Sequence, residues 1–349
     1  MLGGYLMLFC VILLQSATSI RAQCAWEYNR TSVTCRLRIL ERTGLDLQDA
    51  EGSTKLDIVC NDVYLYESQW PVNNVFAKFS TLKELWIDSC KLLQLSVGTF
   101  DGLNGLKVLR VNTKNAEWSP GKSLEIYNDS LQHLKELQTL DLSDNNLRAL
   151  PEAALCPLSS LQVLNLTMNR IRSADSLGFA DRNCVGGSEL QTLDASYNEL
   201  RTIPSNWGTS GLRRLQQLYL QYNNISDLSA DALAGLTSLR ILNLSSNHLE
   251  VIPEGLFAAS KELREIHLQN NQLFELPRGL FHRLEQLLIL DLSANQLSSH
   301  HIDNATFSGL IRLIILNLAH NALTKIDSKT FKELYFLQLD VFKTTKIWL

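Results

Sequence analysis

Hydrophobic residues recur along the chain in one fixed pattern. The template L-x-x-L-x-L-x-x-N-x-L occurs in eight successive copies, whose first residues lie 24 to 29 residues apart. The copies begin at Leu137, Leu161, Leu190, Leu215, Leu239, Leu263, Leu287 and Leu313. A period of this length is the signature of a leucine-rich-repeat solenoid.

Each template position predicts a structural role. Apolar residues at positions 1, 4, 6 and 11 point into a shared core, and positions 3 to 5 form a short strand of a parallel sheet on the concave side. The Asn at position 9 hydrogen-bonds the backbone where the chain turns away from the sheet. These residues are therefore structural and not ligands: Asn145, Asn169, Asn198, Asn223, Asn247, Asn271, Asn295 and Asn321.

Weaker copies precede these eight. One begins at Leu82 and has Cys90 at the Asn position, one begins at Leu106, and a still weaker one begins at Ser53. A large apolar residue also lies six residues before most repeat starts, which predicts a stacked spine along the convex side. The spine residues are Phe76, Phe100, Leu131, Leu155, Leu233, Phe257, Phe281, Phe307 and Phe331.

The pattern therefore predicts an α/β leucine-rich-repeat solenoid, a curved horseshoe with a parallel concave β-sheet and an irregular or 3-10 convex side. We expect a signal peptide at 1–22, an N-terminal cysteine cap at 23–81, about ten repeats at 82–338 and an aberrant tail at 339–349.

The N-terminus carries an apolar run from Tyr5 to Leu14, followed by small and polar residues that allow cleavage after Ser19 or Ala22. This arrangement is typical of a secretory signal peptide. An uncleaved anchor is the alternative. No later run reaches the length of a membrane span, so we expect a secreted chain, or one on the extracellular side of the plasma membrane.

The last repeat begins with Phe331, Leu334 and Leu337 and then loses the template at Asp340 and Thr345. No cysteine-rich cap follows. The interpretation is a truncated product, either biological or produced by an error in the gene model.

Six cysteines follow the signal peptide, and an even number in an exported chain predicts disulfides. Cys184 takes a spine position and Cys156 lies next to one, so these two are expected to pair. Cys60 and Cys90 occupy neighbouring turns of successive early repeats, which leaves Cys24 with Cys35 in a hairpin-like cap. Sequence alone still allows other connectivities.

Six N-x-[ST] sequons predict N-linked glycans. They are at Asn29, Asn128, Asn165, Asn224, Asn243 and Asn304. Asn165 and Asn243 fall on the concave sheet, where glycans obstruct a ligand that spans the middle of the arc. A ligand is then left with the cap and early repeats, the convex side or edges, or the strands after Leu263.

The chain carries no recognisable catalytic or cofactor motif. It contains no phosphate loop, H-E-x-x-H or C-x-x-C motif, and the adjacent pair His300 and His301 is best read as a solvated loop. We expect no cofactor, no metal and no enzymatic activity. A net charge of -4 and a pI near 6.0 do not indicate the basic surface that nucleic-acid-binding proteins use.

Function is therefore expected in surface recognition. The exposed strand residues Tyr219, Glu265 and His267 combine aromatic, acidic and titratable groups, as protein interfaces do. An ordinary solvated sheet surface is the alternative reading of these three residues.

The chain resembles the N-terminal part of an insect Toll receptor ectodomain, of the long eighteen-wheeler-like kind. The segments LDIVCNDV, ELWIDSCKLLQLSVGTFDGL, AEWSPGKSLEI and HHIDNATFSGLIRLIILNLAHN carry this resemblance, together with the cysteine placement. It implies a type I receptor that binds cystine-knot cytokines of the Spätzle type, or receptors on neighbouring cells, and that signals in innate immunity and development. The later repeats, membrane helix and cytoplasmic signalling domain of that family are not in this sequence.

The leading hypothesis is the ligand-binding front end of a Toll-related receptor, in a truncated form that could act as a soluble decoy. The alternative is a cell-adhesion or matrix leucine-rich-repeat protein. Binding of a purified cystine-knot ligand favours the first, and aggregation of beads or cells without it favours the second.

Overall fold

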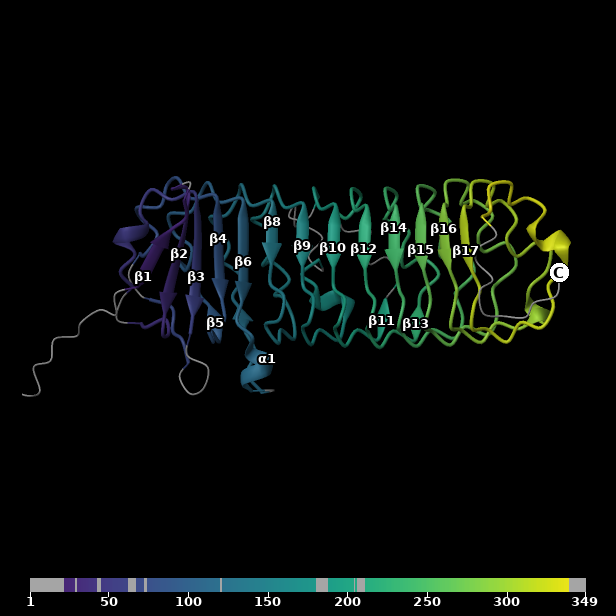
Figure 1. Cartoon of the computed structure of the whole chain (residues 1–349), viewed down its shortest axis with the longest axis horizontal. Coiled ribbons are helices and arrows are strands. Elements are labelled where there is room, and N and C mark those ends of the chain that lie inside the picture. The colour runs from purple at the N-terminus through teal and green to yellow at the C-terminus, as the bar shows by residue number, and fades with distance from the viewer. Residues whose placement is uncertain are drawn as a thin grey trace, which may run out of the picture.

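The computed structural model describes residues 22–28, 30–42, 45–61, 67–71, 74–119, 121–179, 188–203, 205 and 211–338. Within these residues one 13-stranded sheet runs the whole length of the molecule (Figure 1). Its strands follow chain order and every pairing after the first is parallel. One strand per repeat, with the chain returning behind the sheet each time, confirms the predicted solenoid.

The N-terminal strands are the longer ones. They are β1 (Gln23–Trp26), β2 (Ser32–Leu37), β3 (Lys55–Cys60), β4 (Glu84–Asp88) and β6 (Val108–Asn112). The later strands have three residues each: β8 (Thr139–Asp141), β9 (Val163–Asn165), β10 (Thr192–Asp194), β12 (Gln217–Tyr219), β14 (Ile241–Asn243), β15 (Glu265–His267), β16 (Ile289–Asp291) and β17 (Ile315–Asn317). These later strands occupy template positions 3 to 5, as predicted.

Away from the main sheet, regular structure is sparse in the described residues. Two short pairs lie there, β5 (Gln94–Leu95) with β7 (Glu125–Ile126) and β11 (Thr202–Ile203) with β13 (Asp227–Leu228). The 3-10 segments are η1 (Gln48–Ala50), η2 (Ala174–Ser176), η4 (Ser299–His301) and η5 (Ser328–Phe331). The α-helical content is α1 (Asn115–Trp118), which is four residues long. The fold is thus a β-solenoid with few helical residues.

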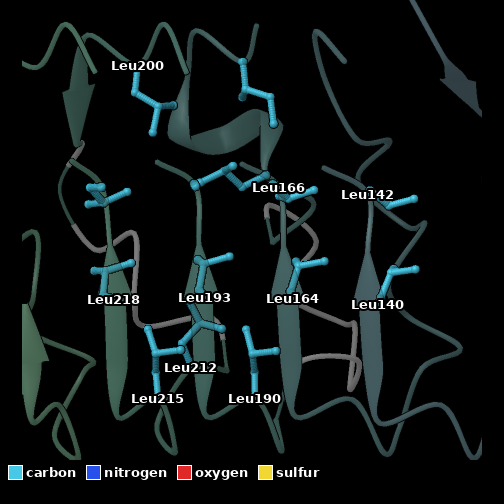
Figure 2. Packing of buried hydrophobic residues seen from close by; sticks show 14 of the residues in the cluster. Leu140, Leu142, Leu164, Leu166, Leu190, Leu193, Leu200, Leu212, Leu215 and Leu218 are labelled. Atoms are coloured by element: carbon cyan, nitrogen blue, oxygen red, sulfur yellow. The ribbon is translucent and has the colours of Figure 1, made fainter. Parts of the chain in front are cut away.

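The template leucines form one continuous core. Leu140, Leu164, Leu193 and Leu218 lie side by side at the same level of adjacent strands (Figure 2), and all four are fully buried. Burial of a leucine side chain stabilises the fold by about 1.5–3 kcal/mol. Because each repeat packs on its two neighbours, stability accumulates along the row.

The position 9 asparagines form the predicted ladder. Asn198 shows the pattern: its Nδ2 donates to the carbonyl oxygens of Leu166 and Ala195 at 2.8 and 3.1 Å, and its Oδ1 accepts from the backbone N–H of Ile171 at 3.0 Å. One side chain therefore satisfies buried backbone groups of two repeats.

The convex spine is also present. Phe257, Phe281, Phe307 and Phe331 stack in sequence, with ring centroids 6.0, 6.3 and 6.1 Å apart. Phe257, Phe281 and Phe307 are buried, and Phe331 packs against the same core.

The residue at position 8 adopts a left-handed backbone conformation in most repeats. These residues have φ between 51° and 58°: Ser89, Asp144, Met168, Tyr197, Tyr222, Ser246, Asn270, Ala294 and His320. For the position 8 residues from Asp144 to Ala294, the backbone N–H donates to a backbone carbonyl of the next repeat. The N–H of Tyr197, for example, donates to the carbonyl of Gln221 at 3.0 Å. The chain leaves the sheet at this point, so these residues line one lateral edge of the solenoid.

Disulfides hold the N-terminal end. Cys24 and Cys35 join the antiparallel strands β1 and β2, and Cys60 and Cys90 join the ends of successive repeats. Cys156 is also disulfide-bonded. Its expected partner, Cys184, lies outside the described residues, as do most of the expected signal peptide and the tail at 339–349.

Candidate protein-binding surface

The exposed face of the 13-stranded sheet presents three parallel rows of side chains, from template positions 3, 5 and 7. The row at position 5 contains, in order, Asp57, Trp86, Arg110, Asp141, Asn165, Asp194, Tyr219, Asn243, His267, Asp291 and Asn317. Strand register therefore decides which of these side chains meet.

The early end of this row carries a cluster that we call the Trp86 clamp, formed by Lys55, Trp86 and Arg110. The Lys55 Nζ lies 3.8 Å from the centroid of the Trp86 ring, and the Arg110 Cζ lies 5.4 Å from it. Both distances are within the range of cation–π attraction. Two cations, one from each neighbouring strand, thus lie against the indole ring.

The clamp follows from the register of β3, β4 and β6. Trp86 is directly opposite Asp57 on one side and Arg110 on the other. Lys55 is two residues before Asp57, so it reaches the ring as a diagonal neighbour, which long side chains can do. Alternation of buried and partly exposed residues along β4 places the indole on the exposed face.

Carboxylates surround the clamp. Asp141 lies 3.7 Å from the Arg110 Nε, and Asp57 lies 3.9 Å from the Lys55 Nζ. Burial is the main cause that raises the pKa of Asp57, while Lys55 opposes this shift and Glu27 and Glu84 add to it. The site therefore combines an aromatic ring, two cations and several acids in one small area.

The three residues predicted as an interface lie farther along the sheet. Tyr219 and His267 flank Asn243 in the position 5 row, and the His267 Nε2 is 3.5 Å from the Glu265 carboxylate. Burial, followed by Glu265 and Asp194, raises the pKa of Tyr219. The structure brings these side chains together around a sequon asparagine. Their role in binding stays a prediction.

The described sequon asparagines are all at least partly accessible. Asn128, Asn224 and Asn304 are exposed, and Asn165 and Asn243 are half-buried on the sheet. The Oδ1 atoms of Asn165 and Asn243 accept from the backbone N–H of Thr167 and Ser245, at 3.0 Å in both cases. Asn29 lies outside the described residues, and glycosylation of all six remains a prediction.

Sequence reasoning did not select the Trp86 clamp. The three residues that the pattern singled out, Tyr219, Glu265 and His267, belong to later repeats, although the copy from Leu82 already places Trp86 at position 5. The meeting of Lys55 with Trp86 required the register of β3 and β4, which the irregular spacing of the first repeats hides.

Among the residues that the structure describes, no group of three or more His, Cys, Asp or Glu side chains could hold a metal ion. In the same residues no helix has the length and apolar character needed to cross a bilayer. His301 contacts the carbonyl of Phe274 through its Nδ1 at 3.1 Å and lies in η4, in keeping with an ordinary loop residue.

Comparison with known proteins agrees with this architecture. The leucine-rich-repeat family model matches residues 124–171, 188–249 and 261–300. Toll-like receptor 7 of Drosophila melanogaster is 67% identical over 311 residues, which are 87% of this chain and 21% of that receptor. Mouse opticin is 36% identical over 62% of the chain and 60% of its own length. The chain thus spans about a fifth of the receptor that it matches.

Solved structures show the same fold. A Toll–Spätzle complex from Drosophila matches with a TM-score of 0.65 at 18% identity, over 91% of this chain and 53% of the other. A complex of TLR13 with ssRNA13 gives 0.65 at 25% identity, over 82% and 39%. The receptor repeat domains matched here are non-enzymatic. The chain is therefore a leucine-rich-repeat solenoid, and over most of its length its sequence is similar to that of a Toll-like receptor.

Proposed function

We propose that this chain is the extracellular ligand-binding part of a Toll-related receptor and that its protein ligand docks on the Trp86 clamp. The observation that carries the proposal is the indole held between Lys55 and Arg110 on the exposed face of the sheet. Trp and Arg are the side chains that most often dominate the free energy of protein binding.

The surroundings of the clamp favour a protein over a nucleic acid. Asp57, Glu84 and Asp141 lie beside the two cations, and carboxylates repel phosphate groups. Mixed charges around an aromatic centre instead match the rim and core of a protein interface.

The position of the clamp also fits the predicted glycans. Asn165 is three strands from Trp86 in the position 5 row, which the usual strand spacing puts at about 14 Å. A glycan on Asn165 or Asn243 would crowd Tyr219, which lies between these two asparagines, and would leave the clamp open.

The ligand class that we propose is a cystine-knot cytokine of the Spätzle type. Two findings support it: the 67% identity with a Drosophila Toll-like receptor and the fold shared with a Toll–Spätzle complex. An extracellular location is supported by the disulfides of the cap, which persist in oxidising compartments. The proposal covers the chain both as part of a membrane receptor and in released form. It also includes roles in immunity and development.

The test uses surface plasmon resonance to measure the binding of a purified Spätzle-type cystine-knot cytokine to the secreted chain. We expect Trp86→Ala to weaken binding about 30-fold or more, as loss of a central aromatic anchor does. Tyr219→Ala is the matched control, because it removes the other large ring of the same row, and we expect it to change affinity less than threefold.

Equal losses in both variants would place the ligand on the middle of the sheet and contradict the clamp as the docking site. Absence of cytokine binding, together with aggregation of beads coated with this chain, would instead support the adhesion alternative.

A further inference from the structure

Two tyrosines on the lateral edge are not explained by the fold or by the proposed ligand site. Tyr197 and Tyr222 occupy position 8 of successive repeats, and their rings stack with centroids 4.4 Å apart and planes 15° apart. About half of each side chain is exposed, 50% for Tyr197 and 49% for Tyr222. A stacked aromatic pair therefore stands open to solvent.

The backbone at position 8 is unfavourable for such residues. Tyr197 and Tyr222 have φ of 54° and 56°, a left-handed conformation that suits Asn, Asp and Gly and is costly for bulky side chains. The other residues in this left-handed position are Ser89, Asp144, Met168, Ser246, Asn270, Ala294 and His320, so the two tyrosines are the largest side chains there. Large rings in this conformation gain little from the core, so a contact outside the core would account for them.

A sequon lies next to this pair. Asn224, Ile225 and Ser226 form it, and Tyr222 precedes the asparagine by two residues. The intervening Asn223 points inward, with its Nδ2 3.0 Å from the carbonyl oxygens of Ala195 and Leu220. Tyr222 and Asn224 flank this buried side chain, and both are exposed on the edge.

The neighbouring repeat brings the second ring to the same place. The backbone N–H of Asn224 donates to the carbonyl of Leu200 at 2.9 Å, and that of Tyr197 donates to Gln221 at 3.0 Å. These bonds lock the two turns in register, so the turn that carries Tyr197 lies beside the turn that carries the sequon.

We propose that the Tyr197–Tyr222 pair is a built-in platform for the first sugar of an N-linked glycan on Asn224. Transfer from a lipid-linked diphosphate oligosaccharide joins the Asn224 Nδ2 to C1 of N-acetylglucosamine. The amide loses one proton, and the lipid diphosphate leaves with the electron pair of the broken C1–O bond. The C–H face of the sugar then packs on the electron-rich face of an aromatic ring.

The other sequons lack this arrangement. In the described residues, the side chain two positions before the asparagine is Ile126 for Asn128, Val163 for Asn165, Ile241 for Asn243 and Ile302 for Asn304. Tyr127 directly precedes Asn128 and is 47% exposed. It stacks on no other aromatic ring among the described residues, and it is one residue from the asparagine instead of two. Asn128 is therefore an internal control.

The experiment compares the secreted chain with variants that lack the glycan, the ring or both. Asn224→Gln and Ser226→Ala remove the sequon in two independent ways, and Tyr222→Ser installs the residue that Ser246 already provides one repeat later. Glycopeptide mass spectrometry establishes occupancy of Asn224, and the midpoint of thermal unfolding is then measured for each variant.

We expect loss of the Asn224 glycan to lower the midpoint by about 1–3 °C in the parent chain and to have no resolvable effect when Tyr222 is Ser. In isotope-labelled glycan, C–H protons of the first sugar should shift upfield in NMR spectra of the parent chain and return toward ordinary values in Tyr222→Ser. Met168→Ser, at the same edge position without a following sequon, should leave these signals unchanged.

An unmodified Asn224, an equal midpoint shift with and without the Tyr222 ring, or unshifted sugar signals would each overturn the proposal. None of these measurements uses a protein ligand, so their failure is distinguishable from failure of the proposed ligand binding.

Discussion

The early and middle parts of the sheet use the same scaffold in different ways. Strands β3, β4 and β6 have five or six residues and carry large and charged side chains. The Cys60–Cys90 disulfide joins the end of β3 to the turn after β4. The main-sheet strands from β8 to β16 have three residues each, carry a mixture of polar and aliphatic side chains on the exposed face, and are followed by the asparagines of position 9. The disulfide lies in the repeats that precede the asparagine ladder and its hydrogen bonds. The same repeats carry the Trp86 clamp on the exposed face of the sheet.

The largest effect should come from breaking the ladder in the middle region. Asn198→Ala leaves the buried N–H of Ile171 without its acceptor. It also removes one of the two amide donors to the carbonyl of Leu166 and one of the two to the carbonyl of Ala195. We expect a loss of about 3–5 kcal/mol in the free energy of unfolding. Denaturant unfolding measures it, and Arg201→Ala is the control, because that side chain of the same repeat is exposed and lies outside every sequon. A loss under 1 kcal/mol would show that water replaces the amide.

The matching break in the early region is removal of the Cys60–Cys90 disulfide. We expect the double variant Cys60→Ser with Cys90→Ser to lose about 2–4 kcal/mol. Because repeats contact only their neighbours, faster hydrogen exchange should be confined to β2, β3 and β4. Equal acceleration at β14 and β15 would contradict this local response.

How far the sequence predicts the molecule depends on the range of the interaction. The buried leucines, the asparagines at position 9 and the spine phenylalanines recur at fixed offsets, so their environments could be predicted from the pattern. The Trp86 clamp could not, because it joins Lys55, Trp86 and Arg110 across strands of irregular spacing. The left-handed conformation at position 8 has no hydrophobic signature at all.

A smaller effect is expected on ligand affinity when a sequon in the middle of the sheet is removed. Asn243 is six strands from Trp86 in the position 5 row, about 29 Å by the usual strand spacing. We therefore expect Asn243→Gln to change affinity for the cytokine less than twofold in surface plasmon resonance. A tenfold gain on loss of this glycan would mean that the ligand extends over the middle strands.

The smallest effect concerns Asp57. Burial raises the pKa of this carboxyl above its value of 3.8 in the unfolded chain, so the folded state holds its proton more tightly. The resulting stability is present at low pH and is lost as the pH rises through the folded-state pKa. Solvent screens much of this effect, so Asp57→Asn should raise stability at pH 7 by only a few tenths of a kcal/mol.

The check is denaturant unfolding of the parent chain and Asp57→Asn at pH 4 and at pH 7. The difference between the two proteins should be larger at pH 7. A destabilised variant at pH 7 would show that the carboxylate is held by Lys55 more strongly than burial opposes it.

Because each repeat contributes one strand, the repeats are evenly spaced along the solenoid. Each repeat in the regular region consumes about 24 residues of chain and advances the sheet by one strand spacing, about 4.8 Å. Distance along the sequence therefore translates linearly into distance along the sheet. Insertion or deletion of one whole repeat would move every later side chain by one strand spacing and keep it in the same row. The distance between two surface sites can therefore change in steps of one strand while the residues of each site stay the same.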